Sequence, residues 1–430
     1  MIRRVCQLGS VLMFSTALAA CSTETETETE SVDSQGVKQL TFSAWGNPAE
    51  QEVYQRAVDE FNEMHDDVEV SMTGIPADSY FRTIMTRLQG GQAPDVFYVG
   101  AENISTLIGN ETIVELSDFL ETDASHVTAD EFPEDIWGAA KQDDQIYGLS
   151  VDSNPMLMYY NKTLLENAGV KSPQEHYEEG NWNWETFEQV TGQLRDAGYY
   201  GFVQEGGHAD MLSWVWTNGG EFSNENDEIV ADQDERTLEA LEYVHRMVQE
   251  NHFIFAGTLP QGQGGDAMFV SNQVGFVAAG RWLTPLFSES NLEFDYIPWP
   301  TNTGNQMEPA NIATAYIAAN QESDHLEEAM QFISYYASQE GQSIRLEDDG
   351  NAVPSVEGIE DIVTEAQVPE HSEYLIEARD IGNVISLEYQ AAGLDVDLAD
   401  IYEIMLIGDM EPEEAVEQAA DLSRLMLETE

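Results

Sequence analysis

Short apolar runs alternate with longer stretches of helical periodicity after a polar N-terminal stretch. Residues 40–45, 68–72 and 94–99 have the composition of buried or half-buried strands. Between them, residues 49–64 and 80–88 place apolar side chains on one helical face. Three strands joined by helices in this order predict an α/β fold with a parallel sheet and right-handed crossovers.

The carboxyl ends of the predicted strands are the expected ligand-facing edge of the sheet, because ligands in parallel sheets sit beyond these ends. Trp45 ends the first strand and Asn47 follows it, whereas Glu102 and Asn103 follow the third strand. We therefore expect these four side chains near a binding site. For Trp45, a place in the core is an equal alternative.

The first residues of the chain predict export. Residues 1–20 combine a basic start with an apolar run too short to cross a bilayer, which is typical of a secretory signal peptide. The motif that ends at Cys21, Leu-Ala-Ala-Cys, resembles the bacterial lipobox, in which this cysteine becomes the lipidated first residue of the mature chain. Repeated Thr-Glu pairs in residues 21–36 predict an extended acidic tether.

We thus expect a lipid-anchored protein on the outer face of the cell membrane, which is the periplasmic side in a Gram-negative host. An ordinary signal peptide with an incidental cysteine is the alternative.

Charge and composition narrow the function further. The chain of 430 residues has 16 Lys and Arg against 81 Asp and Glu, a formal net charge of −65, which excludes a nucleic-acid partner. Hydrophobic residues make up 42% of the chain, enough for a large core in two or three domains. The two cysteines, Cys6 and Cys21, have neither disulfide-framework nor zinc-site spacing, so we expect no metal and no cofactor.

The acidity itself predicts a halophilic protein, since molar salt screens self-repulsion. An alkaline exterior is the competing explanation.

A series of short motifs resembles, in its order along residues 38–425, the extracellular solute-binding proteins of ABC sugar importers, the maltose-binding-protein-like group. The motifs that carry this resemblance include Trp45-Gly46, Gly90-Gly91, Pro94-Asp95-Val96, Tyr159-Tyr160-Asn161-Lys162, Trp182-Asn183-Trp184, Asp266-Ala267-Met268-Phe269, Gly280-Arg281-Trp282 and Ile297-Pro298-Trp299-Pro300.

The resemblance implies two α/β lobes of the periplasmic-binding-protein type, joined by a hinge and closing over a ligand cleft. It assigns residues 37–150 and 301–353 to the N-terminal lobe and residues 151–300 and 354–430 to the C-terminal lobe. It also implies three crossing segments between the lobes, near residues 149–153, 298–300 and 353–356.

Sugar binding requires carboxylates or amides that match adjacent hydroxyls and aromatic rings that pack on C–H faces. By resemblance, Trp282 lies on the cleft wall under a sugar ring, Glu102 binds sugar hydroxyls, and Asn154 occupies a cleft position in the second lobe. The same resemblance makes further ligand-binding candidates of Trp45, Asn47, Asn103, Asp210, Trp214, Asn311 and Tyr389. Two choices stay open, namely His208 against Asp210 and Trp216 against Trp214. By resemblance, Tyr389 and the pair Asp395 and Asp397 fall in a C-terminal helical region that often lends one aromatic ligand, and the sequence leaves their register open.

These observations predict a monomeric substrate-binding lipoprotein that captures a sugar or oligosaccharide and delivers it to the permease subunits of an ABC transporter. The chain contains no recognisable catalytic motif, so we expect no enzymatic activity. A secreted carbohydrate-active enzyme is the alternative class. A receptor for a glycerol phosphate ester would need cations near the site, and only Arg281 lies near a candidate wall.

Overall fold

The computed structural model describes residues 36–142, 144–260, 263–290, 292–348, 350–366 and 369–428. The expected signal peptide, the lipidation site Cys21 and nearly all of the expected tether lie outside these residues. None of the helices in the described ranges combines the length and the apolar character needed to span a bilayer.

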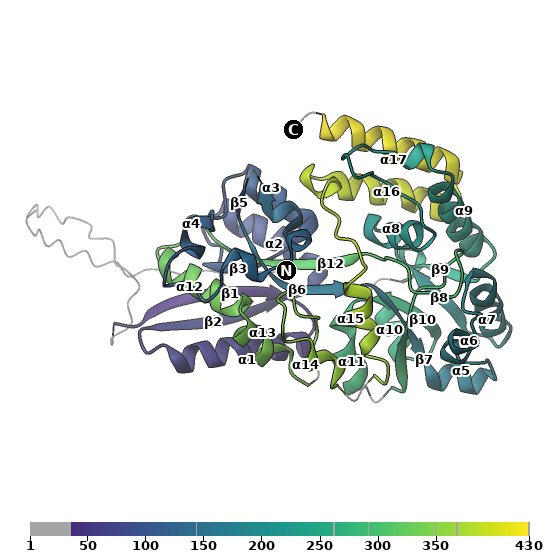
Figure 1. The fold of residues 1–430 in the computed structure, drawn as a ribbon, viewed down its shortest axis with the longest axis horizontal. Coiled ribbons are helices and arrows are strands. Elements are labelled where there is room, and N and C mark those ends of the chain that lie inside the picture. The colour runs from purple at the N-terminus through teal and green to yellow at the C-terminus, as the bar shows by residue number, and fades with distance from the viewer. Residues whose placement is uncertain are drawn as a thin grey trace, which may run out of the picture. The chain divides into compact units, whose positions relative to one another are not determined.

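The first sheet has five strands and contains all three strands expected near the N-terminus (Figure 1). They are β1 (Lys38–Trp45), β2 (Val68–Ile75), β3 (Val96–Gly100), β6 (Leu149–Pro155) and β12 (Ile312–Ala319). The order across the sheet is β2-β1-β3-β12-β6. β1 pairs in parallel with β2 and β3, as predicted, whereas β12 runs antiparallel to both of its neighbours.

The second sheet also has five strands, in the order β11-β7-β10-β8-β9. They are β7 (Leu157–Asn161), β8 (Tyr200–Gln204), β9 (Phe253–Phe255), β10 (Val274–Ala279) and β11 (Phe294–Ile297). β8 lies parallel to β9 and β10, and β7 runs antiparallel to β10 and β11. A short antiparallel pair, β4 (Lys141–Gln142) and β5 (Gln145–Ile146), precedes β6.

Helices surround both sheets. Those that follow the first-sheet strands are α1 (Pro48–Met64), α2 (Ala77–Gln89), α3 (Ile104–Gly109), α4 (Ser117–Leu120), α12 (Leu326–Ala337) and α13 (Gln339–Leu346). Those between the strands of the second sheet are α5 (Lys162–Ala168), α6 (Pro173–Glu178), α7 (Trp184–Asp196), α8 (His208–Thr217), α9 (Glu235–Gln249), α10 (Gly265–Val270) and α11 (Thr284–Glu289). The C-terminal helices are α14 (Asp361–Thr364), α15 (Glu373–Arg379), α16 (Leu394–Leu406) and α17 (Pro412–Leu427).

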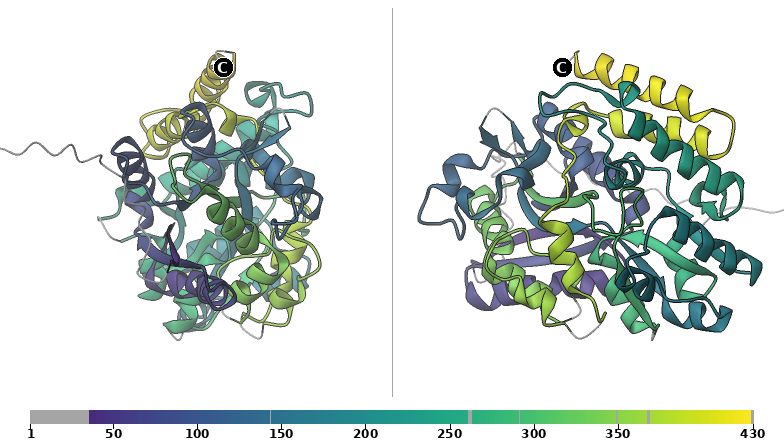
Figure 2. Two further views of the ribbon diagram at one scale, coloured as in Figure 1. Left: turned by 90° about the vertical axis from the view of Figure 1, so that its left-hand side faces the viewer. Right: turned by 45° about the vertical axis from the view of Figure 1, so that its right-hand side comes forward.

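The C-terminal helices α16 and α17 belong with the second sheet, although they follow the last strand of the first. They lie side by side and both contact α9, as Figures 1 and 2 show. α16 also contacts α8. This packing brings residues near position 395 close to the start of α8.

Strand pairing shifts two of the lobe boundaries expected from the resemblance. Residues 153–155 of β6 still pair with β12, so the chain leaves the first sheet only at Met156 rather than within residues 149–153 or at position 150. On the return path, Thr301 pairs with Asn183 of the second lobe, and the first sheet resumes only at Ile312. The backbone N–H of Met156 donates to the carbonyl of Asn311 at 2.8 Å, so these two crossings lie side by side.

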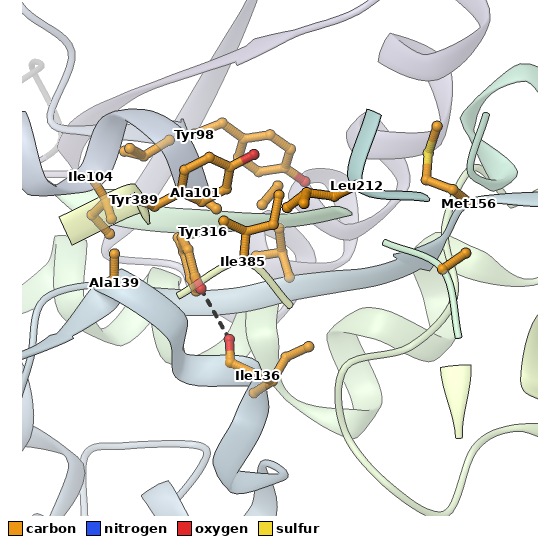
Figure 3. Close-up of a cluster of buried hydrophobic side chains, with 14 of the residues drawn as sticks. Tyr98, Ala101, Ile104, Ile136, Ala139, Met156, Leu212, Tyr316, Ile385 and Tyr389 are labelled. Carbon is orange, nitrogen blue, oxygen red and sulfur yellow. Dashed lines mark hydrogen bonds between the residues drawn. The ribbon is translucent and has the colours of Figure 1, made fainter. Parts of the chain in front are cut away.

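The hydrophobic core continues across the crossings. One cluster of buried side chains contains Phe42 of the first sheet and Phe276 of the second. Figure 3 shows the part of this cluster near the crossings, where Met156 and Leu212 are drawn with Tyr98 and Tyr316. The Tyr316 hydroxyl donates to the backbone carbonyl of Ile136 at 3.0 Å, which satisfies its buried polar atom.

Candidate functional site

The first strand ends in an aromatic side chain and a helix cap. Trp45 is half-buried and meets Tyr80 and Tyr98 edge to face, with ring centroids 5.2 and 5.3 Å away. The Asn47 side-chain oxygen accepts from the backbone N–H of Glu50 at 3.1 Å, and the Glu50 carboxylate accepts from the N–H of Asn47 at 2.9 Å. This capping box starts α1 and uses the oxygen of Asn47 within the helix terminus.

Glu102 and Asn103 follow the third strand in the short helix η1 (Ala101–Asn103), and both are half-buried. The Asn103 side-chain amide donates to the Glu102 carboxylate. Burial raises the pKa of Glu102 to about 7, and the negative charge of Asp395 adds to the rise. Asp395 lies on α16 of the C-terminal segment, so the structure brings together two carboxylates almost 300 positions apart in the sequence.

Asp210 lies in the first turn of α8 and is half-buried. Burial raises its pKa to about 7, followed by the charges of Glu205 and Asp395. Burial likewise raises the pKa of Asp395 to about 6. Of the residues that the structure describes, no lysine or arginine forms an ion pair with Glu102, Glu205, Asp210 or Asp395. We call these four residues the acidic cluster.

Glu205 is the one member of the acidic cluster whose side chain is exposed. Loss of solvation still raises its pKa, with the charge of Asp266 as a smaller cause. Sequence analysis missed Glu205, because a polar residue at the end of β8 has no distinguishing pattern in a chain with 81 acidic residues.

Tyr389 joins the acidic cluster from the short helix η7 (Glu388–Gln390), which contacts both η1 and α16. It is 9% exposed, and Figure 3 draws it in the same apolar group as Ala101 and Ile104. Burial raises its pKa well above the usual value, followed by the charges of Asp395, Glu102 and Asp210. Its hydroxyl makes no hydrogen bond to any residue within the described ranges.

Trp282 lies after β10 in the short helix η6 (Arg281–Leu283) and is half-buried. The Cβ of any other residue at Gly280 would lie 2.2 Å from the Trp282 ring and 2.6 Å from the Cβ of Asn154. Glycine at this position therefore lets the indole and the end of β6 approach closely. Asn154 is buried, and its side-chain oxygen accepts from the backbone N–H of Arg281 at 3.2 Å.

The Arg281 side chain turns into the protein. It is 2% exposed, and its guanidinium donates to the backbone carbonyls of Ala352 at 2.9 Å, Asp348 at 3.1 Å and Leu346 at 3.4 Å. These bonds direct the one cation that sequence analysis found near a candidate wall toward the backbone.

Trp214 lies in the core, where its ring area is already covered by protein. It is 0% exposed, and its indole N–H donates to the side-chain oxygen of Gln204 at 2.8 Å. It packs edge to face on Trp299 at 4.9 Å and stacks on Phe253 at 5.6 Å. Trp216 on the same helix is half-buried.

His208 is a buried core residue at the start of α8, and desolvation lowers its pKa to about 3. It is therefore neutral, and Asp210 is the residue available at this helix end.

Asn311 is buried at the crossing, where its backbone N–H donates to the Ser213 hydroxyl at 3.3 Å. In the C-terminal region, Asp395 is half-buried in the acidic cluster, whereas Asp397 is exposed.

Within the described ranges, two groups of side chains bring together residue types that can bind a metal ion. The first is Glu188, Glu250 and His252, and the second is Asp295, Glu370 and His371. Arg246 lies 2.9 Å from the Glu188 carboxylate and 3.5 Å from that of Glu250. Lys162 is 3.2 Å from both acids of the second group. We assign no metal to either group, because each already holds a cationic side chain.

The first of these groups borders a hollow of about 680 Å³ between α7 and α9. None of the candidate ligand residues lines it.

Residues 56–374 match the family model described as bacterial extracellular solute-binding protein. An uncharacterised lipoprotein of Streptomyces antibioticus is 27% identical over 144 residues, 34% of this chain and 30% of that protein. The arabinooligosaccharide-binding protein of Bacillus subtilis strain 168 is 22% identical over 260 residues, 58% of this chain and 55% of that protein. The chain therefore spans about half or less of the length of these curated relatives.

Among solved structures, a substrate-binding protein of an ABC transporter from Listeria monocytogenes, in complex with cycloalternan, superimposes with a TM-score of 0.78. It is 23% identical, and the match covers 90% of this chain and 98% of that one. This likeness establishes the two-lobed fold for nearly the whole chain.

Proposed function

Because the chain belongs to the bacterial extracellular solute-binding proteins, we propose that it captures a sugar or oligosaccharide between its lobes and presents it to the permease of an ABC importer. The acidic cluster carries the proposal. It joins Glu102 of the first lobe to Asp210 and Asp395 of the second, beside the hydroxyl of Tyr389.

The chemistry of these groups suits a polyhydroxylated ligand. Each carboxylate offers two acceptor atoms to adjacent hydroxyls, and the free tyrosine hydroxyl both donates and accepts. Trp45 and Trp282 remain half-buried at strand ends, so each can offer ring area to the C–H face of a sugar. The proposed ligand-binding set is Trp45, Asn47, Glu102, Asn103, Asn154, Asp210, Asp395, Trp282, Asn311 and Tyr389.

Closure of the lobes follows from where the proposed ligand groups lie. A ligand that bonds to Glu102 on one lobe and to Asp210 on the other stabilises the arrangement in which both reach it. The segments that cross between the lobes at Met156 and Asn311 are the proposed bending points. We propose this closed, liganded form as the one that the permease recognises.

Charge argues for a neutral or hydroxyl-rich ligand over a phosphorylated one. An anionic ligand would meet four carboxylates, while Arg281 is held by backbone carbonyls. Two of the similar proteins are named for arabinooligosaccharide or were solved with cycloalternan, which supports an oligosaccharide.

The family is extracellular, and we further propose that a lipid on Cys21 anchors a monomeric protein to the outer face of the cell membrane. Replacing Cys21 by Ser should release the protein from washed membranes into the medium. Continued membrane retention would argue against the lipid anchor.

Thermal unfolding of the purified mature protein against a carbohydrate panel tests the ligand assignment. The panel contains glucose, maltotriose, arabinotriose and cycloalternan, with spermidine, triglycine and zinc as non-sugar controls. A sugar present at about one hundred times its Kd should add about 2.7 kcal/mol to the free energy of unfolding. If no sugar raises the midpoint but one of the three controls does, the sugar assignment fails.

A further inference from the structure

Arg281 links the two lobes through one buried side chain. It follows β10 of the second sheet, but its guanidinium binds the carbonyl of Leu346, the last residue of α13, and those of Asp348 and Ala352 beyond it. α13 packs against α1 and α12 of the first lobe. A cation is favourable at this helix end because the last carbonyls have no partner within the helix.

The segment that Arg281 binds leads directly into the third crossing. The carbonyl of Val353 accepts from the backbone N–H of Ser153 in β6 at 2.9 Å. The Ser355 hydroxyl donates to the carbonyl of Ser150 at 2.8 Å. Arg281 therefore holds the end of the crossing segment that precedes these bonds to β6.

The backbone around Arg281 is also fixed on the side of the candidate binding wall. Its N–H donates to the Asn154 side chain at 3.2 Å, and Trp282 follows immediately. Gly280 lies close to both the indole and the Asn154 side chain, where a Cβ would clash with each. Because Arg281 and Trp282 are adjacent in the chain, a backbone displacement at Trp282 also moves Arg281 and strains its bonds to three carbonyls. Loss of these bonds is costly because the guanidinium is buried.

We infer that Arg281 is a positioning residue that couples the Trp282 wall to the third crossing and so transmits ligand contact to lobe closure. The inference rests on the proposed function, because it takes Trp282 as a ligand-contacting residue. The side chain itself touches no ligand.

Arg56 provides a matched control at the same helix end. It lies on α1 of the first lobe, and its guanidinium donates to the carbonyls of Glu347 at 2.9 Å and Arg345 at 3.5 Å. Arg56 and Arg281 therefore both bind carbonyls around the C-terminus of α13, but only Arg281 does so from the other lobe.

The experiment compares Arg281→Met and Arg56→Met in the mature protein. Reporter dyes on Glu52→Cys of α1 and Glu242→Cys of α9, both exposed positions, measure the distance between the lobes. The only native cysteines are Cys6 and Cys21, and Cys21→Ser makes labelling specific. Maltotriose and arabinotriose are the probes, and calorimetry gives their Kd.

Arg281→Met should weaken binding of the probe sugar at least about tenfold and reduce the sugar-induced distance change, whereas Arg56→Met should alter Kd less than about twofold. Normal affinity and closure in a folded Arg281→Met protein would overturn the inference, as would equal losses in both variants. If Arg281→Met does not fold, Arg281→Lys keeps the charge but loses the fork of donors, and the same comparison applies.

A failure of the proposed function gives a different result. If no sugar binds the unaltered protein, the distance distribution without sugar still tests the coupling. Arg281→Met should broaden it and Arg56→Met should not. Equal distributions would then refute the coupling independently of the ligand.

Discussion

Near η1, α8 and α16, four carboxylates lie together without a basic partner among the described residues, whereas near the crossings two buried arginines donate to backbone carbonyls. Arg281 binds the end of α13, and Arg345 donates to the carbonyl of Val151 in β6. Arg345 also lies over the ring of Tyr336, 5.3 Å from its centroid.

This difference shows how a chain with 81 acidic and 16 basic residues distributes its charge. The two buried arginines near the crossings donate to backbone carbonyls where the lobes join, and no basic residue within the described ranges pairs with the acidic cluster. The cluster keeps its acceptor atoms free for hydroxyl groups, at the cost of mutual repulsion. The comparison therefore predicts that variants near the crossings change geometry and variants in the cluster change ligand chemistry.

The largest expected effect is at Trp282. Trp282→Ala should raise the Kd for the probe sugar about 100-fold, because a stacked sugar loses most of its apolar contact area. The unfolding midpoint should change less than for a fully buried tryptophan, since part of the indole is already exposed to solvent. Calorimetric titration and thermal unfolding measure the two quantities.

Trp214→Ala is the control for Trp282→Ala. It removes a fully buried indole and should lower the free energy of unfolding by about 3–5 kcal/mol. If Trp282→Ala destabilises the protein as strongly as this control, Trp282 is a core residue and the proposed binding wall is wrong.

The acidic cluster should give a smaller, chemically specific effect. Glu102→Gln and Asp210→Asn should each raise the Kd about tenfold, because a charge-assisted hydrogen bond to a sugar hydroxyl becomes a neutral one. Asp397→Asn, two positions from Asp395 on the same helix but exposed, should change the Kd less than about twofold. Equal effects at Asp397 and Asp210 would mean that only the net charge matters.

The local pattern predicted the first lobe well because its first three strands and two helices are consecutive in sequence. β1, α1, β2, α2 and β3 all lie where apolar periodicity placed them. The later strands of that sheet could not be located in the same way. β12 inserts between β3 and β6 from more than 150 residues away, and antiparallel pairing across that separation leaves no short-range signal.

Site residues were predictable in type but not in burial. Helical spacing indicates that Trp214 and Trp216 face different directions, but only the contacts with Gln204 and Trp299 identify Trp214 as the core residue. Likewise, Asp395 and Asp397 are equivalent by composition until the packing of α16 against α8 exposes one and partly buries the other. Such distinctions depend on tertiary contacts rather than on sequence pattern.

The smallest expected effect is a change in how stability depends on pH. The pKa values of Glu102 and Asp210, about 7 in the folded protein, lie above those of an unfolded chain, so the folded state binds more protons between about pH 4.5 and pH 7. Their contribution is fully present below about pH 4 and is lost as the pH rises through 7. The double variant Glu102→Gln with Asp210→Asn removes this titration, so the difference from the unaltered protein should be smallest near pH 4 and the variant should become relatively more stable as the pH rises to 8. Partial solvent access limits the difference to about 1 kcal/mol, or about 1–2 °C in the unfolding midpoint without ligand. Parallel pH profiles would show that both carboxylates ionise normally and that burial does not raise their pKa values.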